Sequence, residues 1–305
     1  MIEGPPDDDT EQWDIALYPD TTVGLSMFMN FGWVTFQVLI DKNGNPYGFS
    51  QPMQRYRSKI IIGSNIGAKN AVLFRANNGK IYGAAAYLGG EKGSNTEIEI
   101  ADMSDPTNIK VVSTLPGTSP IPIIRTIYLS NSVYLVTAGT VPPYGLVIFD
   151  VSNPFQPVEV NRISTDDMYG ITDFEVWNNR VYCLGRPKNA STIISVGAFD
   201  IESPSNVKKV FSTGGLDWRY MNISGFGDYL VISGSSATSN DLPIIVYDLK
   251  QVNRPVNFTI EPPNGDWLYE SEMDTLLFEK GSSLIFYRAA YKRMSYTVIT
   301  KGCFK

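Results

Sequence analysis

The sequence contains no histidine among its 305 residues. This absence excludes Ser-His-Asp and Cys-His nucleophile systems, histidine-ligated zinc sites and imidazole switches near neutral pH. Cysteine is almost as scarce, because only Cys183 and Cys303 are present. They lie far apart without metal-ligand spacing, so they predict neither a disulfide framework nor a metal site. We therefore expect no cofactor and no metal.

A concentration of positive charge is also missing. The 25 basic residues are scattered along the chain, and the 31 acidic residues bring the net charge to −6. Binding to nucleic acid or to an anionic membrane surface requires clustered Lys and Arg side chains. We expect neither partner.

No long hydrophobic run is present that would cross a membrane. Residues 23–40 carry no charge over 18 positions, but glycine and polar residues interrupt them and β-forming residues are frequent. This stretch predicts paired strands, and no membrane span is expected. The N-terminus has Asp7, Asp8, Asp9 and Glu11 where a secretory signal needs positive charge followed by an apolar run, so a signal peptide is not expected.

The chain does contain a repeat of about fifty residues. Four segments combine an apolar strand, an Asp and a nearby Pro, and their Asp residues are separated by 48, 50 and 48 positions. A turn rich in Asn or Gly, followed by an apolar pair, precedes each of them. Asn and Gly supply the positive φ angles that tight hairpins need. The four segments are 98–102, 146–150, 196–200 and 244–248, and the turns lie at 77–80, 131–132, 178–180, 227–228 and, in a last unit, 281–283.

Each unit is therefore predicted to hold a hairpin, a third strand and a Pro-containing turn into a fourth strand. Four antiparallel strands per repeat and no helical periodicity predict an all-β chain, a β-propeller of six blades with five as the alternative. We expect an arm at 1–12 and one propeller domain at 13–305. In it, residues 13–60 hold a closing strand (13–19, paired in the last blade) and a degenerate blade, 61–260 hold four regular repeats and 261–305 the last blade.

Residues 146–154 carry a recognisable motif, Leu-Val-Ile-Phe-Asp-Val-Ser-Asn-Pro, with Pro157 and Val158 following. It resembles the LVIVD repeat of bacterial and archaeal β-propellers, and the resemblance covers about 61–260. It implies a propeller of the cell-surface or uncharacterised type and brings no catalytic residue to this chain.

The recurring Asp residues could be catalytic or structural. An Asp that closes a strand can accept a hydrogen bond from the backbone N–H two residues on and fix the following turn. Because the Asp recurs at one position of four units, we interpret it as a turn residue. These residues are Asp102, Asp150, Asp200 and Asp248.

The longer loops are predicted to open on one face of the propeller and to hold exposed aromatic residues beside Arg and Asp. Such a composition is typical of a recognition surface. The alternative is that Trp218 and Trp267 fill gaps between blades. The candidate binding residues are Tyr144, Tyr169, Arg186, Asp217, Trp218, Arg219, Asp266, Trp267 and Tyr269.

We expect a non-catalytic scaffold or recognition module, most simply a structural subunit of a virus or phage particle or tail. In that case the arm 1–12 and the long-loop face bind protein partner subunits, and the protein belongs to an oligomer or larger complex. One alternative is a bacterial cell-surface binding protein of the LVIVD type, located outside the cell. Another is a glycoside hydrolase that uses only carboxylates, drawn from Asp166, Asp217, Asp266 and Glu270.

Overall fold

The structure is a computed structural model, and it consists of β-strands with a single 3-10 turn in the part that is described. The described residues are 12–17, 23–28, 32–44, 46–51, 53–57, 68–87, 97–116, 122–139, 145–163, 168–189, 192–217, 220–234, 244–251, 256–260, 274–281, 283–290 and 293–300. Among them, no helix has the length and hydrophobicity needed to cross a membrane.

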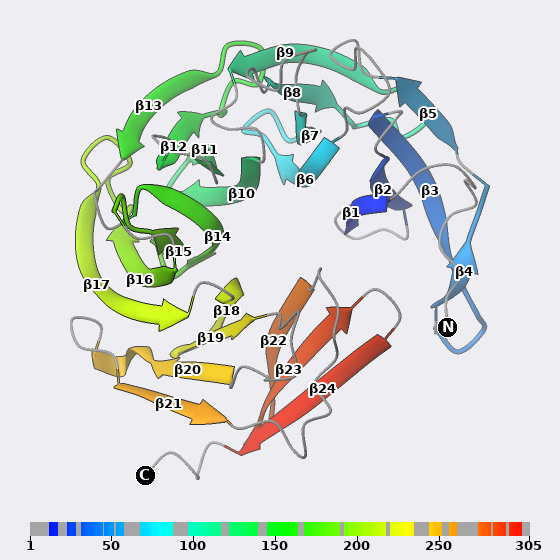
Figure 1. The fold of residues 1–305 in the computed structure, drawn as a ribbon. Helices are drawn as coiled ribbons and strands as arrows, with labels where there is room; N and C mark the ends of the chain where they lie inside the picture. Colours follow the sequence, from blue (N-terminus) through cyan, green and yellow to red (C-terminus); the bar gives the residue numbers. More distant parts are fainter. Residues whose placement is uncertain are drawn as a thin grey trace. The chain divides into compact units, whose positions relative to one another are not determined.

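The chain divides into two compact units, Met1–Ile163 and Ser164–Lys305. In the first unit, three antiparallel sheets follow one another along the chain (Figure 1, blue to green). The first sheet holds β1 (Gln12–Leu17), β2 (Val23–Phe28), β3 (Gly32–Ile40), β4 (Pro46–Phe49) and β5 (Gln54–Arg57). The second holds β6 (Ala68–Arg75), β7 (Ile81–Tyr87), β8 (Glu97–Asp102) and β9 (Lys110–Pro116), and the third β10 (Pro122–Leu129), β11 (Ser132–Gly139), β12 (Leu146–Asp150) and β13 (Val158–Ile163).

The second unit also holds three antiparallel sheets (Figure 1, green to red). Two have four strands in chain order, and the last has three among the residues described. The strands are β14 (Gly170–Trp177), β15 (Arg180–Arg186), β16 (Ile193–Asp200) and β17 (Lys208–Asp217); β18 (Tyr220–Phe226), β19 (Tyr229–Gly234), β20 (Ile244–Asp248) and β21 (Val256–Ile260), with the turn η1 (Leu249–Gln251); and β22 (Asp274–Lys280), β23 (Ser283–Ala290) and β24 (Arg293–Thr300).

The expected all-β chain of four-stranded antiparallel sheets is therefore found. The role expected for residues 13–19 is wrong. The strand Gln12–Leu17 pairs with Val23–Phe28 in the first sheet and is not part of the last one. A hairpin with a five-residue connection has a much smaller loop-closure entropy than a pairing that links the two ends of the chain, which favours the local partner.

Strand alternation explains why the central strands are apolar on both sides. In the second sheet, Ala84 and Ile100 belong to a core cluster shared with the third sheet, whereas Ala85 and Ala101 belong to one shared with the first. Successive side chains of a strand point to opposite faces, so a sheet covered on both faces needs apolar residues at every position. The same packing joins β14–β17 to β18–β21 in the second unit, where Val196 and Ile232 share a core cluster.

The hairpin tips have the backbone conformation that the Asn and Gly residues predict. Asn178 and Asn179 both have positive φ angles, 48° and 58°, as a tight two-residue hairpin requires. Gly79, Gly227 and Gly281 supply the positive φ angle at the corresponding tips of β6–β7, β18–β19 and β22–β23.

A β-bulge recurs in the fourth strand of three sheets. The register between third and fourth strands shifts so that one extra residue of the fourth strand is left without a partner. These extra residues are Val112, Val160 and Val210, separated by 48 and 50 positions. A bulge interrupts the edge of a sheet, and it therefore discourages pairing with strands of other molecules.

Neighbouring sheets are also joined by polar contacts at their hairpin tips. The Asn77 side-chain Nδ2 donates to the carbonyl of Asn131 at 2.6 Å, and the Trp177 indole Nε1 donates to the carbonyl of Gly227 at 2.6 Å. In each case the tip of one sheet donates to the tip of the next. The first strands, which are sheet edges, are linked similarly: the Arg75 N–H donates to the Tyr128 hydroxyl and the Ile223 N–H to the Asp173 carboxylate, both at 2.9 Å.

Candidate functional site

Three of the nine predicted binding residues lie in the described part of the chain, and they share one end of sheet β14–β17. Tyr169 precedes β14, Arg186 ends β15 and Asp217 ends β17. The register pairs Gly170 with Arg186 and Ile193 with Asp217, which places all three at the same end. We call this the loop end of the sheet. Tyr144, Trp218, Arg219, Asp266, Trp267 and Tyr269 lie outside the described residues.

The loop end is built on Met168, a residue that sequence reasoning missed. Met168 is 1% exposed, and its side chain lies over Gly185 and Gly197 of the sheet. A β-carbon on Gly197 would come within 2.5 Å of the Met168 Cε, and one on Gly185 would be closer still to the sulfur. The Met168 sulfur also lies 3.9 Å from the Sγ of buried Cys183. Glycine at two neighbouring strand positions was the available signal, because it leaves room for a side chain from outside the sheet.

Met168 fixes the position of the next residue. The backbone N–H of Tyr169 donates to the carbonyl of Arg186 at 3.0 Å, which ties the segment before β14 to the end of β15. The ammonium of Lys188 lies 5.5 Å from the centre of the Tyr169 ring, within the range of a cation–π contact. Tyr169 is half-buried, whereas Arg186 and Lys188 are exposed. The half-buried Asp217 completes this end of the sheet.

The arrangement suits binding more directly than it suits catalysis. A half-buried aromatic ring beside the Lys188 ammonium, on a sheet end that also carries exposed Arg186 and half-buried Asp217, can contact apolar, anionic and hydrogen-bonding groups of a partner. Of the four carboxylates considered for glycoside hydrolysis, only Asp217 is described; Asp166, Asp266 and Glu270 lie outside the described residues. Within the described ranges, no three His, Cys, Asp or Glu side chains are grouped as a metal site would need.

The four recurring Asp residues share one geometry. Each carboxylate accepts a hydrogen bond from the backbone N–H two residues on, at 2.9 to 3.0 Å. The residue between each Asp and its N–H donor is apolar and buried. The N–H of this residue donates to a carbonyl near the start of the second strand of the same sheet. This is the geometry that the turn interpretation requires. The donors to Asp102, Asp150, Asp200 and Asp248 are Ser104, Ser152, Glu202 and Lys250, and the buried residues are Met103, Val151, Ile201 and Leu249.

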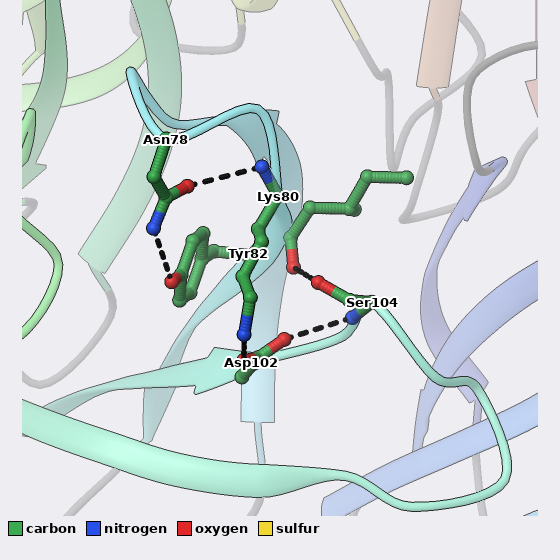
Figure 2. Close-up of polar contacts among 6 residues, drawn as sticks. Asn78, Lys80, Tyr82, Asp102 and Ser104 are labelled. Atoms are coloured by element: carbon green, nitrogen blue, oxygen red, sulfur yellow. Dashed lines mark hydrogen bonds and ion pairs between the residues drawn. The ribbon is translucent and has the colours of Figure 1, made fainter.

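Asp102 shows how such a carboxylate is held (Figure 2). It accepts from the Ser104 N–H at 3.0 Å and pairs with the Lys80 ammonium at 2.9 Å. Asn78 holds the same hairpin, because its side chain accepts from the Lys80 N–H at 3.0 Å and donates to the Tyr82 hydroxyl at 2.9 Å. Partial burial raises the pKa of Asp102, but the hydrogen bonds from Ser104 and Lys80 outweigh it and leave the pKa below its ordinary value. A catalytic acid needs the opposite shift.

The turns after Asp102 and Asp150 also contact the preceding sheet. The Ser113 hydroxyl donates to the carbonyl of Pro154 at 2.6 Å, and the Thr35 hydroxyl donates to the carbonyl of Pro106 at 2.5 Å. The Pro of the repeat thus offers a carbonyl to its neighbour in addition to stiffening its own turn.

A buried carboxylate lies between the first two sheets of the first unit. Glu99 is 2% exposed and accepts a hydrogen bond from the Trp33 indole Nε1 at 3.3 Å. Burial, and then the nearby Glu99 carboxylate, raise the pKa of Tyr56 above its ordinary value. Because Glu99 and Trp33 are buried and Tyr56 is partly buried against the same core cluster, we interpret these groups as part of the packing and not as a binding site.

No family model matches the chain, and no curated protein matches its sequence. Solved structures do resemble it. A putative 6-phosphogluconolactonase from Bacteroides uniformis ATCC 8492 aligns with a TM-score of 0.53 and 14% identity over 81% of this chain and 70% of that one. One from Bacteroides fragilis NCTC 9343 gives 0.51 and 14% over 78% and 68%, and the polysaccharide lyase Uly1 gives 0.50 and 11% over 94% and 77%. At these identities the likeness concerns the fold alone.

Proposed function

We propose that this chain is a six-bladed β-propeller in which each antiparallel sheet is one blade. The described residues contain six sheets, and in both units a sheet packs its face against that of the next. The contacts between successive hairpin tips and between first strands support a rotational repeat. Five blades remained an alternative on the sequence, and six sheets favour the larger number.

The proposed function is recognition of a protein partner through the loop end, without catalysis. The observation that carries this proposal is Tyr169, which follows buried Met168, is tied through its N–H to the Arg186 carbonyl and lies with its ring beside the Lys188 ammonium. An aromatic residue whose backbone is tied to the sheet and whose ring lies beside a cation is a typical anchor of a protein interface. Asp217, at the same end of the sheet on β17, adds a carboxylate, so the loop end can contact groups of either charge.

We further propose that the partner is another subunit of a larger assembly, such as a virus or phage particle or tail, with the arm 1–12 as a second contact. A bacterial cell-surface binder of the LVIVD type would use the same loop end and is the second candidate. The activities of the structural neighbours, lactonase and polysaccharide lyase, are not transferred to this chain because the identities of 11 to 14% carry the fold only.

Site-specific photocrosslinking in the native host tests the role of the loop end. Benzoylphenylalanine at Tyr169 should give one dominant covalent adduct with a partner protein. The matched control is Phe155, which is 56% exposed in a turn at the opposite end of its own sheet. Equal adducts from both positions, or none from Tyr169, would contradict partner recognition at the loop end.

A further inference from the structure

The last sheet differs from the other sheets of its unit at its outer strand. In β14–β17 and β18–β21 a fourth strand covers the third, whereas no described strand pairs with the outer edge of β24. Thr300 of β24 occupies the position of the recurring Asp, because it pairs with Ser283 as Asp248 pairs with Tyr229. β24 is therefore a third strand by its register and an edge strand by its position.

The exposure of Val298 shows the consequence. Val298 lies two positions before Thr300 and is 52% exposed. The residues two positions before the recurring Asp in the four other repeats are all no more than 1% exposed. They are Ile100, Ile148, Ala198 and Val246. An apolar residue with this degree of exposure on a sheet edge favours a further strand that would cover it.

The edge of β24, like that of the shorter strand β21, lacks the bulge that interrupts the outer strands β9, β13 and β17. The pairing of β24 with β23 runs over eight consecutive residue pairs without a shift, whereas β9, β13 and β17 each carry a bulge. A long and regular edge is a template for strand addition.

The sequence of β24 is complementary to itself. In an antiparallel pair of two β24 strands related by a two-fold axis normal to the sheet, residues opposite each other lie on the same face. With Tyr296 on the axis, Met294 lies opposite Val298 of the other copy, and apolar residues meet along that face. Arg293 lies opposite Ile299, so no two like charges meet.

We propose that two copies of this chain associate through their β24 strands, antiparallel and centred on Tyr296, to form a continuous six-stranded sheet. The partner is a second copy because Met294 and Val298 place an apolar residue two positions to either side of Tyr296, so the pattern of apolar residues reads the same in both directions. This dimer does not involve the loop end, so a test of the dimer and a test of the proposed function give independent results.

Sedimentation of the full chain over a range of concentrations tests the proposal. The unmodified protein should form a dimer as its concentration rises. Val298→Lys should raise the dissociation constant at least about 100-fold, because the contact between Val298 and Met294 of the other copy occurs twice in the dimer and each loss costs about tenfold in affinity. Val158→Lys is the matched control, because Val158 is 58% exposed on the bulged strand β13; it should leave association unchanged. A monomer at every concentration overturns the proposal, as does a dimer that Val298→Lys does not weaken.

Crosslinking gives a second measurement should Val298→Lys fail to fold. In a Cys303→Ser background, Tyr296→Cys should be joined across the two-fold axis by a short bismaleimide, whereas Glu159→Cys on exposed β13 should not. Cys183 is buried and does not compete. The absence of a crosslink at Tyr296→Cys would show that the edge of β24 is free. Slow amide exchange of β24 in a monomeric protein would show that the edge is covered within the chain. Either result would overturn the proposed dimer.

Discussion

The indole ring of Trp33 lies directly against Gly83. A β-carbon added to Gly83 would stand 2.8 Å from the Trp33 Cζ3 and 2.9 Å from Cη2, closer than real β-carbons approach. Trp33 is fully buried and belongs to the core cluster between the first two sheets. The absence of a side chain at position 83 thus allows these two sheets to pack.

We expect Gly83→Ala to destabilise the first unit by about 1–3 kcal/mol, the usual cost of overpacking a core. Thermal unfolding followed by circular dichroism measures it. Gly214→Ala is the control, since an added β-carbon there would meet only the Ser195 hydroxyl oxygen at an ordinary 3.4 Å. A Gly83→Ala protein as stable as the control would mean that Trp33 can move away without cost.

The recurring Asp residues should behave as hydrogen-bond acceptors. Asp200→Ala removes the acceptor for the Glu202 N–H and is expected to cost about 0.5–1.5 kcal/mol in the free energy of unfolding. Asp200→Asn keeps a side-chain oxygen and should retain most of that free energy. Urea unfolding of the two variants distinguishes the roles, and equal losses for Ala and Asn would argue that charge, not the turn hydrogen bond, is what matters.

The pair of Asp102 and Lys80 predicts a defined pH dependence. The pKa of Asp102 is lowered from 3.8, so its contribution to stability is present above that value and is lost as the pH falls through the folded-state pKa. The pKa of Lys80 is raised from 10.5, chiefly by the hydrogen bond to Asp102, so its contribution is present below that value and is lost above the raised pKa.

We therefore expect the difference in unfolding midpoint between the wild type and Asp102→Asn to be constant near neutral pH and to vanish in acid. Because the Lys80 side chain is 53% exposed and Asp102 is only half-buried, the difference should be small and should shrink in molar salt. Urea titrations from pH 2.5 to pH 7 measure it. A difference that stays unchanged down to pH 2.5 would contradict the assignment to Asp102.

Met168 should contribute both to stability and to the position of Tyr169. Met168→Ala leaves a cavity over Gly185 and Gly197, and we expect a loss of about 2–4 kcal/mol in the free energy of unfolding. Met53→Ala is a suitable control, since Met53 is 39% exposed and should cost less than about 0.5 kcal/mol. Comparable losses of stability for the two variants would contradict the inference that Met168 supports the loop end.

The non-catalytic proposal is tested at Asp217. Purified protein is expected to show no turnover of aryl glycosides that depends on Asp217 or Asp266. A chromogenic panel assayed with the wild type, Asp217→Asn and Asp266→Asn provides the measurement. Turnover that disappears in either variant would support the carboxylate-only hydrolase and contradict the proposed recognition module.

The repeat could be predicted from the sequence because it is local. The strands before Asp102, Asp150, Asp200 and Asp248 and the turns at the hairpin tips are each specified by a few adjacent residues. The partner of Gln12–Leu17 was assigned wrongly because strand pairing depends on competition between near and distant partners, and the sequence pattern alone does not rank them.

The candidate site could be predicted only in part. Tyr169 and Arg186 were recognised by residue type and by their place in longer loops. The role of Met168 depends on two glycines in other strands, Gly185 and Gly197, that become neighbours only in the folded sheet. The bulges at Val112, Val160 and Val210 depend likewise on a register between strands, which the spacing of residues along one strand does not contain.

Cys183 makes one unit of this chain observable apart from the other. The first unit contains no cysteine, and Cys183 is fully buried in sheet β14–β17 of the second. In a Cys303→Ser background, a thiol reagent can react only when that sheet opens. The rate of labelling then reports the opening of the second unit while the first contributes no signal, so the chain carries its own probe of how independently its two halves unfold.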